Sequence, residues 1–186
     1  IRDNPWIRDI ANFKDISGTR YIGFLSFAIN YYFGGLNTFG YHLVNIIIHI
    51  INAVLVYFLV VLTFSVLSLR GALAPKQSQN EIASALPRND ITPNFIAFSV
   101  SLIFLVHPIQ TQAVSYITQR FTSLATLFYL LALVLYIKAR LVGQGFSPAT
   151  ASNPKGLPYL PLYILSILSA ILAMKTKELS FTLPFI

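Results

Sequence analysis

The sequence from Tyr41 to Leu69 contains no Lys, Arg, Asp or Glu over 29 residues. A helix needs about 20 apolar residues to cross the roughly 30 Å hydrocarbon core of a membrane, so this run is long enough to span it. Three more charge-free runs follow, at residues 91–106, 121–137 and 157–174. Apolar residues make up 55% of the chain and charged residues 10%, which is not the composition of a soluble domain. We therefore predict an all-α, polytopic transmembrane helical bundle.

The chain divides into two regions. Residues 1–40 are predicted to form a loop outside the bilayer, with a helix from Tyr21 to Phe33 that lies along the membrane, because this apolar stretch is short and contains Asn and Tyr. Residues 41–186 are predicted to form the bundle, with about four full spans and the start of a fifth. The sequence begins without Met and ends within an apolar run, so we expect it to be a fragment of a longer protein.

Alternate connections of an up-and-down bundle share one side of the membrane. Residues 1–40, 107–120 and 175–180 are therefore predicted to lie on one side, and the polar linkers 70–90 and 138–156 on the other. Lys and Arg are divided seven to six between these sides, so the positive-inside rule does not orient the chain. The polar residues close to the ends of the spans belong mostly to the first side, where we expect the functional site.

A polar stripe interrupts the first apolar run. His42, Asn45, His49 and Asn52 are three, four and three residues apart, which places them on one face of a helix. Amides and imidazoles are costly to expose to hydrocarbon, so the stripe is predicted to face the interior of the bundle. Hydrogen bonding between helices is the favoured role for His49 and Asn52. His42 lies nearest the interface and is a candidate for binding a ligand.

The net charge of +7 comes from 13 basic residues scattered along the chain, without a patch dense enough to follow a nucleic-acid backbone. Anionic lipid headgroups and anionic lipid-linked substrates are the better partners. The chain has no Cys, and its three His are too far apart in sequence to match a metal-binding motif. We expect neither a metal ion nor a cofactor.

A second polar segment follows residue 106. Pro108 cannot continue the helix unchanged, and if residues 111–120 are helical, Gln112, Gln119 and Arg120 share a face that forms a polar wall beside a lipid phosphate. The alternative is a helix end capped by ordinary polar residues, with Arg120 extending its charged group to the interface.

The end of the last apolar run offers a similar choice. Lys175, Lys177 and Glu178 lie just after it. They form either a solvated basic terminus or, for Glu178, one half of an ion pair with a nearby cation.

Several short motifs occur in an order that resembles a known family. They are Asp3-Asn4-Pro5, Thr19-Arg20-Tyr21, the run GGLNTFGYHLVN from Gly34 to Asn45, His49, the segment from His107-Pro108 to Arg120, and the pair Lys177-Glu178. In combination they resemble the transmembrane and tetratricopeptide-repeat-containing O-mannosyltransferases and their bacterial relatives. The resemblance covers most of the chain and fails in the two linkers. This sequence has Gln112 where the family often has Glu, and Arg20-Tyr21 where it often has Arg-Pro.

The resemblance implies a GT-C type glycosyltransferase, which transfers a sugar from a polyprenyl-phosphate carrier to a protein or glycan hydroxyl at the extracytoplasmic face. In such families an acidic residue of the first loop acts at the catalytic centre. The main acidic residue is thus expected upstream of residue 1, with Asp3 as a substitute candidate. The substrate-binding candidates are Arg20, His42, His107, Gln112, Arg120, Lys177 and Glu178. The resemblance favours the bacterial inner membrane, with the endoplasmic reticulum membrane as the alternative.

The chemistry of the candidates suits this reaction. A sugar phosphate already has a good leaving group, so the enzyme needs a general base for the acceptor hydroxyl and cations for the departing phosphate. Arg20, His107, Arg120 and Lys177 are the expected phosphate partners and are predicted to border one cavity. Two other functions remain open: a non-catalytic scaffold subunit of a larger membrane complex, and a transporter of lipid-linked sugar, although the inverted halves typical of transporters are not apparent.

Overall fold

The structure is a computed structural model that describes residues 20–73, 92–144 and 159–177. Every regular element in these residues is helical, which confirms the all-α class. The α-helices are α2 (Tyr21–Gly34), α3 (Thr38–Leu73), α5 (Pro93–Val106), α6 (Thr111–Ser115), α7 (Arg120–Gln144) and α8 (Leu160–Thr176). Two single 3-10 turns, η2 (Pro108–Gln110) and η3 (Ile117–Gln119), lie between α5 and α7.

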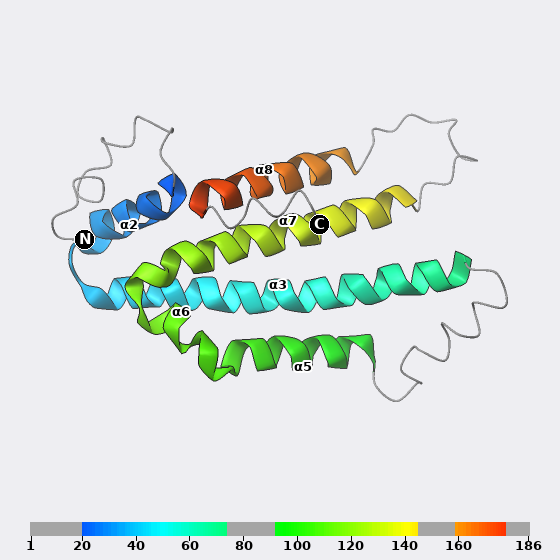
Figure 1. Cartoon of the computed structure of the whole chain (residues 1–186), viewed down its shortest axis with the longest axis horizontal. Helices are drawn as coiled ribbons and strands as arrows, with labels where there is room; N and C mark the ends of the chain where they lie inside the picture. Colours follow the sequence, from blue (N-terminus) through cyan, green and yellow to red (C-terminus); the bar gives the residue numbers. More distant parts are fainter. Residues whose placement is uncertain (1–19, 74–91, 145–158, 178–186) are drawn as a thin grey trace.

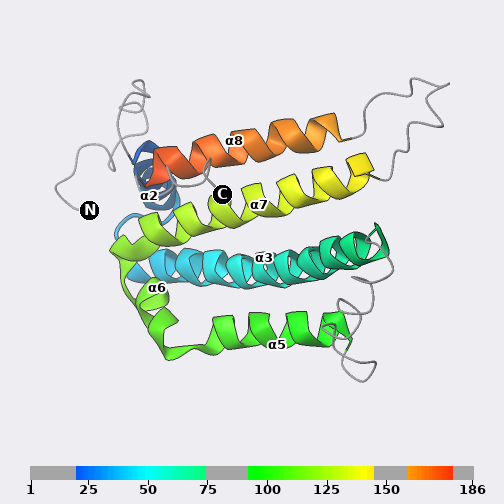
Figure 2. The same cartoon turned by 45° about the vertical axis from the view of Figure 1, so that its right-hand side comes forward.

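Four long helices lie side by side in the order α5, α3, α7, α8 (Figures 1 and 2). The short helix α2 lies at the end of the bundle where α3 begins (Figure 1). The start of α3, the end of α5, α6, the start of α7 and the end of α8 lie at the same end (Figure 1). The described segments predicted to share one side of the membrane are therefore together at one end of the bundle. Which side of a membrane this end faces stays a prediction.

The helix boundaries follow from local chemistry. Gly35 ends α2 with a φ of 56°, a conformation that glycine adopts without steric cost, and its N–H donates to Tyr31 O at 2.8 Å. At the start of α5, Pro93 occupies the first turn, and Thr92 Oγ1 accepts from Phe95 N at 3.3 Å as an N-cap. The expected helix from Tyr21 to Phe33 is present and is one residue longer.

Each apolar run of the sequence corresponds to a helix, but the helices differ in length. In the described part of the chain, residues 38–68 and 117–143 are long and apolar enough to cross a membrane. A third span results if α5 and the segment Pro108–Ser115, which meet at a bend of 50°, count as one. Helix α8 is apolar but has only 17 residues. Four full spans therefore stay a prediction. The orientation of α2 along the membrane surface also stays a prediction.

An aromatic cluster joins α2 to the start of α3 and of α7. Phe121 packs against Phe24 and Phe27, with ring centroids 5.2 and 5.5 Å apart, and Phe27 packs against Tyr41 at 6.2 Å. A Cβ atom at Gly23 would collide with the ring of Phe121, so the close approach of α2 to α7 requires glycine there. This cluster forms one wall of the polar region at this end of the bundle.

Candidate functional site

The polar stripe of α3 binds the irregular segment between α5 and α7. Each of its side chains contacts one backbone carbonyl: His49 Nε2 contacts Leu105 O at 3.1 Å, His42 Nδ1 contacts Val114 O at 3.2 Å, Asn45 Nδ2 donates to Tyr116 O at 3.3 Å, and Asn52 Nδ2 donates to Ser123 O at 3.1 Å. Carbonyls can only accept, so both imidazole nitrogens must carry the proton. The carbonyls of Leu105 and Val114 lie where helices end and the regular helical partners are missing, whereas Tyr116 O also accepts from Gln119 N at 3.1 Å.

This geometry confirms that the stripe faces the interior. Asn45, His49 and Asn52 are 0%, 6% and 3% exposed, and His42 is half-buried. The hydrogen bonds of His49 and Asn52 join helices, as predicted. His42 makes a bond of the same kind, so its position at the interface is explained without a ligand.

Residues 111–120 do not form the single helix on which the polar wall depended. Helix α6 ends at Ser115, Tyr116 is extended with φ −91° and ψ 115°, and α7 begins at Arg120. Gln112 and Gln119 nevertheless line the same pocket, whereas Arg120 turns into the protein. The expectation of one shared face was therefore wrong for Arg120, because the break at Tyr116 rotates α7 relative to α6.

Arg120 is fully buried and ties three helices together. Its guanidinium donates to the Oδ1 atoms of Asn45 at 2.9 Å and Asn30 at 3.1 Å, and to the carbonyls of Tyr41 at 2.8 Å and Ser26 at 3.4 Å. The rings of Phe27 and Tyr41 lie 4.5 and 5.4 Å from its central carbon. Such cation–π contacts add to the stabilisation of a buried guanidinium.

All four acceptors of Arg120 are neutral, and no Asp or Glu occurs among the described residues. The side chain neither extends to the interface nor lines the pocket that contains the other expected cations. The expected position at the interface is therefore wrong, because the guanidinium is hydrogen-bonded inside the bundle, and a role for Arg120 in binding substrate stays a prediction. Arg120 instead organises the fold at this end.

Arg20 and Lys177 come together in a pocket of about 400 Å³, here called the cationic pocket, which is also lined by Thr118, Gln119, Phe121 and Thr122. Lys177 follows α8 in an extended conformation, and its Nζ donates to Thr122 Oγ1 at 2.8 Å. Thr122 Oγ1 in turn donates to Gln119 Oε1 at 3.0 Å. The pocket thus brings two positively charged side chains together. They lie beside a wall formed by η3 and the first turn of α7, where Gln119 and Thr122 are hydrogen-bonded.

The prediction that four cationic side chains border one cavity is only half correct. His107 is exposed at the end of α5, and its Nδ1 accepts from Ile109 N at 3.2 Å, which caps the following turn. It does not line the cationic pocket, and neither does Arg120. Asp3 and Glu178 lie outside the described residues. Among the residues that are described, no group of His, Asp or Glu side chains is arranged to hold a metal ion.

A second pocket of about 340 Å³ adjoins the first, because Gln119 and Thr122 line both. We call it the amide pocket. Its hydrogen-bonding side chains are His49, Asn52, Gln110, Gln112, Gln119, Thr122, Ser123 and Thr126. Sequence reasoning had not connected Thr122 and Thr126 with a site, since both lie in an apolar run. Their spacing of four residues on one helix face, three residues after Gln119, is the signal that was available.

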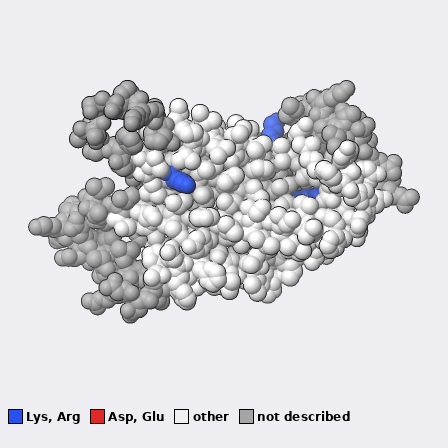
Figure 3. Space-filling view, turned by 180° about the vertical axis from the view of Figure 1, so that it is seen from behind, with Lys and Arg blue, Asp and Glu red and all other residues white. Residues whose placement is uncertain are grey.

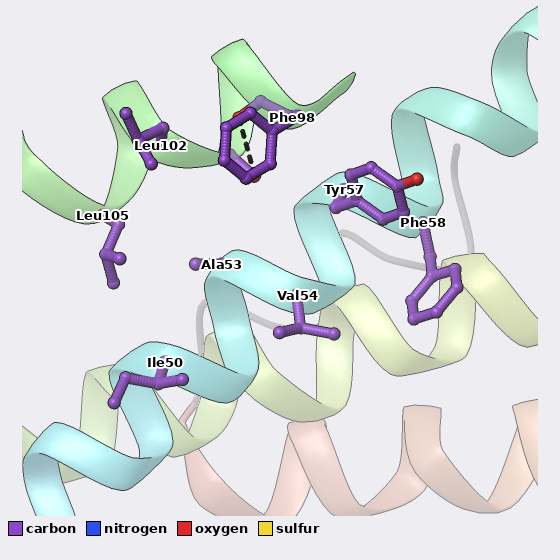
Figure 4. Close-up of a pocket in the computed structure, with 9 residues that line it drawn as sticks. Ile50, Ala53, Val54, Tyr57, Phe58, Phe98, Leu102 and Leu105 are labelled. Carbon is purple, nitrogen blue, oxygen red and sulfur yellow. Dashed lines mark hydrogen bonds between the residues drawn. The ribbon is translucent and has the colours of Figure 1, made fainter. Parts of the chain in front are cut away.

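The groove between α3 and α5 has the opposite character. It has a volume of about 400 Å³ and is lined by Ile50, Ala53, Val54, Tyr57, Phe58, Phe98, Ser101, Leu102 and Leu105 (Figure 4). The hydroxyl of Ser101 donates to Phe98 O at 2.9 Å within its own helix. The groove therefore offers mainly apolar contact, which suits lipid chains. Seen from behind, the described surface is nearly uncharged, with a few separate basic side chains (Figure 3).

Fold and site together define the class of the protein: an integral membrane protein of packed helices, with most of its buried polar groups at one end of the bundle. The chain is 32% identical over 164 residues to a protein O-mannosyl-transferase of Caenorhabditis elegans, covering 86% of this chain. It is 31% identical to protein O-mannosyl-transferase TMTC1 of Mus musculus over 95% of the chain, and 33% identical to TMTC4 of Homo sapiens over 85%.

By this similarity the chain belongs to the TMTC family of protein O-mannosyl-transferases. It spans 20%, 16% and 18% of the length of these three relatives. No protein-family model matches the chain, and no solved structure does.

Proposed function

We propose that this chain forms part of the membrane domain of a GT-C type glycosyltransferase, which transfers mannose from a polyprenyl-phosphate carrier to a protein hydroxyl. One observation carries the proposal: identities of 31% to 33% to protein O-mannosyl-transferases extend over 85% to 95% of the chain. The relatives' names supply the sugar and the type of acceptor. A lipid-linked carrier is part of the proposal because such a donor can diffuse in the membrane to a site at the end of the helices.

The cationic pocket supports a phosphate-bearing donor. Transfer breaks the bond between the anomeric carbon and a phosphate oxygen, forms a bond from that carbon to the acceptor oxygen, and leaves the electron pair on the phosphate. Arg20 and Lys177 are placed to hold this phosphate, and charge-assisted contacts strengthen as its negative charge increases. The acceptor proton passes to a carboxylate base. Asp3 stays the candidate base within this chain.

The topology extends the proposal. We assign residues 1–40 to an extracytoplasmic loop and residues 41–186 to the bundle, so that the cationic pocket opens at the extracytoplasmic face. The reported relatives come from animals, which favours the endoplasmic reticulum membrane over the bacterial inner membrane.

Replacing Lys177 tests the proposal. The full-length protein carrying Lys177→Met should transfer radiolabelled mannose from polyprenyl phosphate mannose roughly 10- to 100-fold more slowly, the loss expected from one charge-assisted contact of about 1.5–3 kcal/mol. The effect should fall on kcat more than on KM, because the charge on the phosphate grows in the transition state. The matched control is Lys138→Met, an exposed lysine of α7 far along the helix from the pocket.

Equal rates for Lys177→Met and the control would remove Lys177 from the donor site. No transfer by well-folded wild-type protein would remove the enzyme assignment and favour the scaffold function.

A further inference from the structure

Among the described residues, the lining of the amide pocket combines many hydrogen-bonding groups with no Lys, Arg, Asp or Glu side chain. Amides and hydroxyls from the α5–α7 segment and from α7 surround it, while Phe104 and Ile109 supply apolar surface. Its volume of about 340 Å³ is within the range of roughly 300–1,000 Å³ typical of small-molecule sites. Such a lining matches a neutral ligand that carries many hydroxyl groups along with apolar C–H faces.

One hydrogen-bond acceptor in the lining of the amide pocket, on Asn52, has no partner among the described residues. The residue is 3% exposed, lines the pocket, and uses its Nδ2 to bond Ser123 O. Its Oδ1 is buried and has no hydrogen-bond partner among the described residues. A buried acceptor without a partner is costly, so a donor brought by a ligand would relieve that cost.

The connection to the cationic pocket narrows the class of ligand. Gln119 and Thr122 line both pockets, and Thr122 Oγ1 already accepts from Lys177 Nζ at 2.8 Å. A neutral group in the amide pocket therefore lies beside an anionic group in the cationic pocket. A sugar linked to a phosphate has this arrangement of a neutral polyol joined directly to an anion.

We propose that the amide pocket is the sugar subsite of the donor, with Gln112, Thr126 and Asn52 among the groups that recognise its hydroxyls. This assignment rests on the proposed function, because it takes the donor to be a polyprenyl-phosphate sugar. The apolar groove between α3 and α5 offers no comparable set of polar partners. A lipid chain in the amide pocket would leave the amides there without partners.

Binding of two carriers to the purified full-length protein in lipid nanodiscs separates the sugar from the phosphate. The probes are polyprenyl phosphate mannose and polyprenyl phosphate. Gln112→Met and Thr126→Val preserve size and remove hydrogen-bonding groups from an exposed and a half-buried position. Each should weaken binding of the mannose-bearing carrier about 3- to 10-fold and change binding of the bare carrier less than about twofold.

Two further variants serve as controls. Thr63→Val removes a hydroxyl that, like that of Thr126, bonds the carbonyl four residues earlier in its own helix, but it lies outside the pocket. It should leave the affinities for the mannose-bearing carrier and for the bare carrier unchanged. Lys177→Met should weaken the binding of both carriers, since both contain the phosphate.

The outcomes distinguish the two proposals. If wild type binds both carriers but Gln112→Met and Thr126→Val change neither affinity, or weaken both equally, the sugar subsite is refuted and the proposed function stands. In that case the amide pocket would contain water and would not bind the sugar. If wild type binds neither carrier, the proposed function fails and the subsite with it.

Discussion

The two halves of α3 are held in the bundle by different interactions. In the first half, the polar stripe from His42 to Asn52 bonds backbone carbonyls of other elements. In the second half, the hydroxyls of Thr63 and Ser65 bond the carbonyls of Leu59 and Val61 in their own helix. Directional bonds between elements set position and rotation, whereas apolar packing tolerates rearrangement. The first half therefore specifies the site, and the second provides length and apolar surface.

The contact between α7 and α8 shows how the remaining helices associate. Ser166 Oγ donates to Ala132 O at 2.9 Å, and Ala132, Ser169 and Ala173 are buried between the helices. Small residues let helix backbones approach closely, and in lipid this packing replaces the hydrophobic effect as the source of association. Compared with the site end, few polar groups are needed to hold this region.

Arg120→Leu should have the largest effect. The substitution removes the donor of the side-chain oxygens of Asn45 and Asn30 and one donor each from the helical carbonyls of Tyr41 and Ser26, and breaking such a buried network costs roughly 3–5 kcal/mol. Thermal unfolding of the full-length protein in detergent measures the loss. Arg140→Leu, at an exposed position of the same helix, should change stability by less than about 0.5 kcal/mol. Similar losses of stability for Arg120→Leu and Arg140→Leu would contradict the claim that polar contacts stabilise the site end more than the other end.

Asn45→Leu should have an intermediate effect of about 1–3 kcal/mol, since it removes the partners of both Arg120 Nε and Tyr116 O. Asn52→Leu should cost less, because the carbonyl of Ser123 lies within α7, where the helix supplies another donor. The same unfolding measurement ranks the two variants. The reverse order would show that the contact between Arg120 and Asn45 contributes little to stability.

Thr63→Val should have the smallest effect, within about 0.5 kcal/mol. Its hydroxyl is exposed and bonds only a carbonyl that the helix already satisfies, so the methyl group replaces it at little cost. A loss as large as that of Asn45→Leu would place an unrecognised polar contact in the second half of α3.

Much of the fold was predictable because it depends on local patterns. Charge-free runs gave the four long helices, and the spacing of the stripe predicted its inward face before any partner was known. The site was less predictable, because its contacts are distant in sequence. Arg120 reaches Asn45 and Asn30 across separations of 75 and 90 residues, and no local pattern distinguishes this from an interfacial arginine. The extended Tyr116 likewise interrupts a segment whose composition permits a continuous helix.

The burial of Arg120 implies an order in which the protein assembles in the membrane. A separate α7 can insert with this charged residue at the interface, because Arg120 is its first residue and flanks the apolar run. The acceptors that replace water around the guanidinium come from α2 and α3, so the charge moves inward only as these helices dock. The polar network around Arg120 is therefore complete only when α2 and α3 are packed against α7, so this end of the bundle depends on helix association as well as on insertion.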